Sequence, residues 1–135
     1  MALGSLIVLG SSQSMAADVT PSPENAMLEI ISPKDGDTVT SPLVVKFGLV
    51  GMGVAPAGVT NKNTGHHHLI VDAPLPDLDF AIPKDAKHRH FGGGQTQVSL
   101  DLTPGQHTLQ LLLGDYRHIP HDPPLSSKKI TITVE

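Results

Sequence analysis

Short runs in which apolar residues alternate with polar ones recur from residue 27 to the end of the chain, with turn-forming residues between them. The run 96–102 places Val98, Leu100 and Leu102 between polar neighbours, and the run 129–134 repeats the same two-residue period. This is the period of a strand that buries one face. No stretch carries a convincing helical period, so the pattern predicts an all-β protein.

Seven segments fit strands, and clusters rich in Pro, Gly and Asp separate them. We expect the strands at 27–31, 43–50, 67–72, 78–82, 96–102, 108–113 and 129–134. About seven short strands with regular turns are typical of an immunoglobulin-like antiparallel β-sandwich. The prediction is therefore a single β-sandwich domain over residues 27–135.

The N-terminus differs in character from the rest of the chain. Residues 3–9 are mostly apolar, and Ser14, Met15 and Ala16 form a small-x-small pattern of the kind that signal peptidase cleaves. We expect a signal peptide over 1–16, a periplasmic or secreted location, and a flexible lead rich in Pro and Ser over 17–26. The apolar run is shorter than the ~18 residues that span a bilayer, so no transmembrane segment is expected after cleavage.

Composition narrows the function. The 135-residue chain contains no cysteine, and its only aromatic residues besides histidine are three Phe and one Tyr. It therefore has no disulfide framework and no thiolate metal site, and Leu, Ile and Val must build the core. The formal net charge of −4 and the scarcity of aromatic side chains argue against nucleic-acid binding.

Seven of the eight histidines gather in three segments, and neutral imidazole is a common ligand of zinc, copper and nickel. In a seven-stranded sandwich the parts of the chain that hold these segments meet at one end of the domain. The seven are His66, His67, His68, His88, His90, His118 and His121, whereas His107 falls at the opposite end. The convergence of these seven histidines predicts one metal site. This convergence depends on the number of strands between residues 72 and 96.

Strand alternation divides the triple histidine. His66 and His68 project from one face and form a chelating pair, while His67 projects from the other and is expected to be a buried, hydrogen-bonded core residue. Each histidine segment also has an interpretation without a metal. These are a polar rim for the triple, a solvated basic turn for the second segment and hydrogen bonds to loop backbone for the third.

The other sequence patterns that could indicate a binding or catalytic site are weaker than the histidine segments. FGGGQ at 91–95 lacks the following helix and the Lys-Ser/Thr of a phosphate-binding loop, so tight backbone geometry beside the histidines is its expected role. Asp72, Asp115 and Asp122 could orient imidazoles, but turns at strand ends account for each of them. The chain has no nucleophile elbow and no HExxH motif, so we expect no enzyme.

Four motifs stand out: GHHH at 65–68, HFGGGQT at 90–96, PGQHTLQLLLGD at 104–115 and HIPHDPP at 118–124. Together they resemble the DUF4399 family over roughly residues 27–135. The family consists of exported bacterial domains of uncharacterised function, so the resemblance implies export and one compact domain and implies no activity. Residues 31–39 also resemble the first turn of periplasmic copper-resistance sandwiches.

We expect a non-enzymatic exported protein that binds a divalent transition metal, copper(II) or zinc, through its histidines. The expected ligands are His66, His68, His90 and His121, with His118 and His67 next. Copper(I) is less favoured because the four methionines form no thioether cluster. Binding is expected to weaken as the pH falls through about 6.5, where imidazole gains a proton.

Two alternatives remain open. One is a metal-free module that binds an envelope protein or an envelope polymer through the same histidines. The other is a small metal-dependent hydrolase, in which a histidine-bound metal ion activates water.

Overall fold

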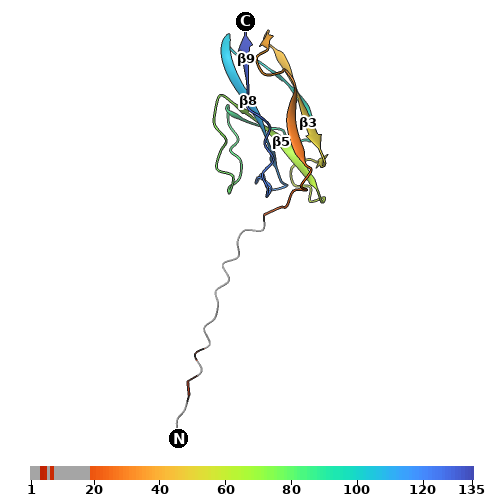
Figure 1. Ribbon diagram of the computed structural model, residues 1–135, viewed down its shortest axis with the longest axis vertical. Helices are drawn as coiled ribbons and strands as arrows, with labels where there is room; N and C mark the ends of the chain where they lie inside the picture. Colours follow the sequence, from red (N-terminus) through yellow and green to blue (C-terminus); the bar gives the residue numbers. More distant parts are fainter. Residues whose placement is uncertain (1–3, 6, 8–18) are drawn as a thin grey trace.

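The computed structural model describes residues 4, 5, 7 and 19–135 of the chain (Figure 1). The signal peptide expected over residues 1–16 therefore lies largely outside the described residues. Within the described part, the named elements are all strands, as predicted for an all-β protein. No helix there has the length and apolar character needed to cross a membrane.

Nine strands of the described chain form two sheets that enclose a common core. The smaller sheet has the order β1-β3-β7, with β1 at Met27–Ser32, β3 at Leu43–Val50 and β7 at Gln97–Leu100. The larger sheet has the order β2-β9-β8-β5-β4, with β2 at Thr38–Val39, β9 at Ile130–Val134, β8 at Gly105–Gly114, β5 at Thr64–Val71 and β4 at Gly53–Val54. A short strand β6, His88–His90, pairs with β5. The pairings are antiparallel except for β2 with β9 and β4 with β5.

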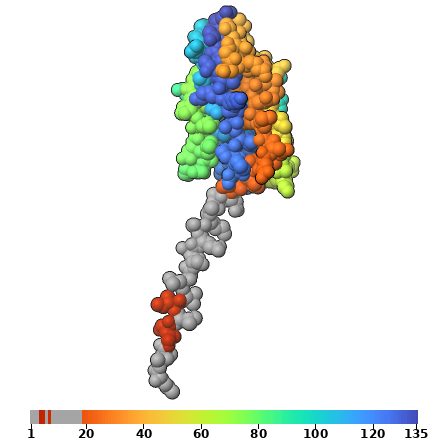
Figure 2. Space-filling model, in the orientation of Figure 1, coloured from red at the N-terminus to blue at the C-terminus, as the bar shows by residue number. Residues whose placement is uncertain are grey.

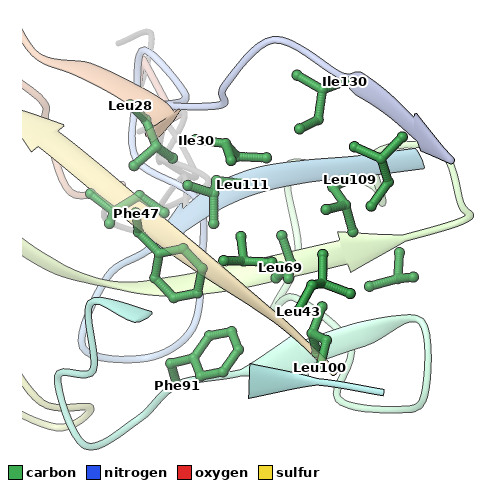
Figure 3. Close-up of a cluster of buried hydrophobic side chains, with 14 of the residues drawn as sticks. Leu28, Ile30, Leu43, Phe47, Leu69, Phe91, Leu100, Leu109, Leu111 and Ile130 are labelled. Carbon is green, nitrogen blue, oxygen red and sulfur yellow. The ribbon is translucent and has the colours of Figure 1, made fainter. Parts of the chain in front are cut away.

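The core lies between the two sheets and is built mainly from aliphatic side chains (Figure 3). β3 buries every second residue from Leu43 to Phe47, as its alternating sequence predicts. Leu69 and Leu111 of the larger sheet pack in the same cluster. The ring of Phe91 lies 5.0 Å from that of Phe47 between centroids. A chain without cysteine is thus stabilised by a continuous apolar interior.

Six of the seven predicted strands are confirmed, with ends that shift by no more than three residues. The strand predicted at 78–82 is wrong. Prolines flank this segment, Asp79 N bonds to Asp77 Oδ1 in a turn, and of residues 78–82 only Ile82 is buried. The loop expected around His88 and His90 is instead β6, and the two-residue strands β2 and β4 were not expected.

The outer face of the larger sheet is covered as well. Ile70 and Leu112 point away from the main core and pack with Ile82, which the segment between β5 and β6 brings over them. Nearby, Gln110 Nε2 donates a 2.9 Å hydrogen bond to the backbone oxygen of Ser127. Because both faces are covered, β5 is buried along its length from residue 65 onward.

The lead expected to be flexible over residues 17–26 is attached to the domain from Thr20 onward. Ser22 N donates to Asp122 O at 3.1 Å, and Asp122 N donates to Thr20 O at 3.0 Å. In Figure 2 the N-terminal residues of the domain, in orange, lie beside the C-terminal ones, in blue. Composition predicted flexibility here, but the backbone finds partners in the loop that follows β8.

Candidate metal centre

β5 carries the triple histidine through the larger sheet, and its alternation sends the imidazoles to two faces, as predicted. His66 and His68 point to the outer face, with their ring centroids 4.7 Å apart. His67 points into the core, 5.0 Å from the ring of Phe47. All three side chains are at most 1 % exposed. They therefore form part of the sheet interior and not a hydrated rim.

β6 brings His90 next to His68. The two residues are direct cross-strand partners, so their side chains share the outer face of the sheet. Their ring centroids lie 5.1 Å apart. A strand therefore positions His90, where the sequence predicted a loop.

His118 joins the group from the loop that follows β8. Its Nδ1 lies 3.0 Å from His66 Nε2, and His90 Nε2 lies 3.2 Å from the same His66 nitrogen. One ligand atom from each of four residues lies within 4.8 Å of the others: His66, His68, His90 and His118. We call these four residues the histidine cluster. It sits on the outer face of the larger sheet, where β5 begins and β8 ends.

The spacing within the histidine cluster suits a metal ion. Nitrogens around a tetrahedral zinc ion lie about 3.3 Å apart, as follows from Zn–N bonds of about 2.0 Å. The two nitrogen–nitrogen contacts of His66, at 3.0 and 3.2 Å, are close to that value. The four ligand atoms lie as far as 4.8 Å apart, so at least one ring would have to move inward for all four to bind the same ion. The four imidazoles could therefore hold a metal ion.

Two glycines leave the space that the imidazoles occupy. A Cβ on Gly92 would overlap Cε1 of His90, and a Cβ on Gly114 would lie 2.6 Å from Cε1 of His68. Gly114 also stands opposite His66 in the pairing of β8 with β5. Any side chain at either glycine would displace a ring of the cluster. The expected role of FGGGQ, close backbone packing beside the histidines, fits this geometry at Gly92.

A turn with unusual backbone geometry presents His118. Its φ is +69°, in the left-handed region that residues other than glycine rarely adopt. The carboxylate of Asp115 accepts hydrogen bonds from the backbone nitrogens of Arg117 and Ile119, at 2.8 and 3.0 Å. His118 O accepts a 2.7 Å bond from Ile82 N. The turn is thus held from two sides, as a strained conformation at a binding site requires.

Burial lowers the pKa of three members of the histidine cluster. It lowers the pKa of His66 to about 4, and the adjacent His118 and His90 add to that shift. Burial, followed by the neighbouring His66, lowers the pKa of His68 to about 3. Burial, His118 and Lys84 lower the pKa of His90. Because neutral imidazole is the form that ligates, these three side chains stay available as ligands at a lower pH than the value of about 6.5 expected from the sequence.

Protein contacts alone leave the cluster short of hydrogen bonds. Nδ1 of both His66 and His68 is buried and has no partner in the described structure. His66 Nε2 lies beside two other ring nitrogens, although it can offer only one proton or one lone pair. Buried polar atoms without partners are uncommon in folded proteins. A shared cation would satisfy the ring nitrogens that converge at His66 Nε2, whereas Nδ1 of His66 lies on another edge of its ring and would stay without a partner.

A comparison with known protein families shows which family this chain belongs to. The profile of a domain of unknown function, DUF4399, matches residues 45–135. The chain belongs to the DUF4399 family. The match begins within β3 rather than at residue 27, and it includes every member of the histidine cluster. No curated protein and no solved structure matches the chain.

Two of the expected ligands of this DUF4399 domain lie outside the cluster. Burial lowers the pKa of His67 to about 4, and neither of its ring nitrogens has a hydrogen-bond partner in the described structure. It is therefore buried, as predicted, but it lacks the predicted hydrogen bond. His121 is also buried, and its Nε2 lies 3.2 Å from Thr64 O. The spacing in HIPH could not reveal that the turn directs His118, and not His121, into the histidine cluster.

The remaining histidines of the DUF4399 domain form separate pairs with aspartates. His88 Nδ1 lies 2.8 Å from Asp85 Oδ1. His107 Nδ1 lies 2.7 Å from Asp72 Oδ2, on a different part of β8 from the cluster, as predicted. Asp72 therefore orients His107 rather than a member of the cluster, and Asp115 shapes the turn at His118.

A small cavity reaches the cluster on the side of its two less buried members. Its volume is about 170 Å³, and it is lined by Ala81, Ile82, Lys84, His90 and His118. The segment between β5 and β6 supplies the first three of these residues. The histidine pattern could not predict this side of the cavity, because the position of these residues depends on how the segment folds back over the sheet.

Proposed function

We propose that this DUF4399 protein is an exported, non-enzymatic protein that binds one divalent transition-metal ion, copper(II) or zinc. The proposed ligands are His66, His68, His90 and His118. The observation that carries the proposal is the convergence of one ligand atom from each of these four residues within 4.8 Å. Imidazole nitrogen suits both metals.

Burial supports the metal over a polar rim. Rim side chains are hydrated, whereas His66 and His68 are at most 1 % exposed, and His66 Nε2 faces two other ring nitrogens at 3.0 and 3.2 Å. Leaving a buried polar group without a partner costs about 1–3 kcal/mol. Several such groups at one place reduce stability unless they bind something, and neutral imidazoles that face one another are suited to a cation.

The ligand chemistry supports copper(II) or zinc in particular. The cluster offers only nitrogen, and the chain has no thiolate. Copper(I) is not favoured because Met52 packs against the apolar core. We propose binding rather than catalysis because, among the described residues, no serine or carboxylate forms a hydrogen bond with an imidazole of the cluster. Export is proposed from the signal-peptide pattern at residues 1–16.

The test is a titration of the chain, free of any histidine tag, with copper(II) and with zinc. His90→Ala removes one proposed ligand. His88→Ala is the matched control, because it removes a half-buried imidazole from the same strand and face that pairs with Asp85 instead. We expect one equivalent of metal to bind, with affinity reduced by about tenfold or more in His90→Ala and unchanged in His88→Ala.

Two results would overturn the proposal. One is equal metal affinity in His90→Ala and His88→Ala. The other is binding no tighter than that of a scrambled histidine-rich peptide. Either would favour the metal-free envelope-interaction module.

A further inference from the structure

The lining of the cavity beside His90 and His118 carries a charge that metal binding by four histidines does not require. Its lining contains one cationic side chain, Lys84, and no carboxylate. Lys84 is exposed and forms no ion pair with any described residue. The neighbouring carboxylate of Asp85 already accepts hydrogen bonds from the backbone of residues 87 and 88. The ammonium group is therefore available to a ligand in the cavity.

Charge balance points to the kind of ligand. A divalent ion held by four neutral imidazoles would keep its full double positive charge in a largely buried place, which is costly. The carboxylate of Asp115 acts on His66 from a distance, but its oxygens are occupied by Thr20 Oγ1 and by backbone nitrogens of the turn. An anion in the cavity would meet the metal ion on one side and Lys84 on the other.

We propose that this cavity binds a small anion, which becomes a further ligand of the metal ion and takes Lys84 as its counter-charge. The inference rests on the proposed metal site. A volume of about 170 Å³ corresponds to roughly six water molecules at ~30 Å³ each. The ligand class is therefore a halide, a pseudohalide or a short carboxylate. His66 and His68 close the other side of the cluster, so the ion is reached from the cavity.

Azide is the probe, because its coordination to copper(II) produces a charge-transfer absorption band and changes the electron paramagnetic resonance spectrum. The untagged chain is loaded with one equivalent of copper(II), the bound copper is counted, and azide is then added at constant ionic strength. Lys84→Met removes the charge and keeps the aliphatic stem. Lys87→Met is the control, because Lys87 lies in the same segment and does not line the cavity.

We expect a saturable azide band in the unmodified protein, about fivefold weaker azide affinity in Lys84→Met and unchanged affinity in Lys87→Met. Ala81→Leu fills the cavity and is expected to abolish the band while copper still binds. Stoichiometric copper without an azide band, or equal losses in the two lysine variants, would overturn the anion site and leave the metal site standing. Failure to bind stoichiometric copper would overturn both.

Discussion

His67 is a core residue whose imidazole works against stability. It is fully buried beside Phe47, and neither of its ring nitrogens has a partner in the described structure. Such burial costs about 1–3 kcal/mol. Replacing His67 with leucine removes the polar atoms and keeps a similar volume. We expect His67→Leu to raise the free energy of unfolding by about 1–2 kcal/mol, measured by urea denaturation at neutral pH.

The same variant separates the two faces of β5. His67 points away from the histidine cluster, so His67→Leu is expected to leave metal affinity unchanged. A loss of stability would contradict the account of His67 as an unpartnered side chain. A loss of metal affinity without a loss of stability would show that His67 contributes to the metal site.

Gly92 is expected to tolerate no side chain, because a Cβ there would overlap Cε1 of His90. Gly92→Ala is predicted to shift the His90 ring and to weaken metal binding by about tenfold, measured by the copper and zinc titration. Gly93→Ala is the control, since its nearest obstacle is the flexible end of Gln95, 3.2 Å away. Equal metal affinity in the two variants would mean that the His90 ring has room to move without cost.

At the scale of elements, the histidine site depends on the cover over the outer face of the larger sheet. Ile82 packs on Ile70 and Leu112, and its backbone N–H donates a hydrogen bond to the carbonyl oxygen of His118. Ile82→Ala is predicted to cost about 2–4 kcal/mol of stability by opening a cavity and to weaken metal binding by loosening the turn at His118. Urea denaturation and metal titration on the same samples measure both effects.

Phe80→Ala is the matched control for Ile82→Ala. Phe80 lies in the same segment but is 67 % exposed, so its loss should change neither stability nor metal affinity by much. If Phe80→Ala and Ile82→Ala had equal effects, the whole segment rather than the buried contact would be responsible.

The elements also show what the sequence could and could not predict. Strand period depends on neighbours in the chain, so the pattern correctly predicted that His66 and His68 share one face of the strand and that His67 lies on the other. The cover over the sheet depends on contacts between distant residues, and for this reason 78–82 was mistaken for a strand. β6 is only three residues long and exists through its pairing with β5. The choice of His118 over His121 required a left-handed turn that no spacing reveals.

Across the whole molecule, the titrating histidines fall into two opposing sets. Burial lowers the pKa of His66 and His67 to about 4 and that of His68 to about 3. In contrast, the hydrogen bonds to Asp72 and Thr103 raise the pKa of His107. The contribution of His107 is therefore present below its unfolded pKa of about 6.5 and is lost as the pH rises through its raised value.

The set with lowered pKa values acts in the opposite direction and includes five residues, because burial also lowers the pKa of His90 and of His121, so it dominates in acid. In the unfolded chain these imidazoles bind protons below about pH 6.5, whereas in the folded chain His66, His67 and His68 stay neutral down to about pH 4. The folded state therefore loses stability as the pH falls through this range. We predict that the metal-free chain loses on the order of several kcal/mol between about pH 7 and about pH 4. Urea denaturation of chelator-treated protein at a series of pH values measures this loss.

His67→Leu tests the origin of that acid sensitivity. It removes one of the buried imidazoles without touching the histidine cluster, so its stability is predicted to fall less steeply with acid than that of the unmodified chain. Zinc at neutral pH should add stability in both proteins, because a ligand that binds only the folded state stabilises it. A flat pH profile in the metal-free protein would mean that the buried imidazoles accept protons as readily when folded as when unfolded. In that case neither their burial nor their neutrality could prepare the cluster for a metal ion.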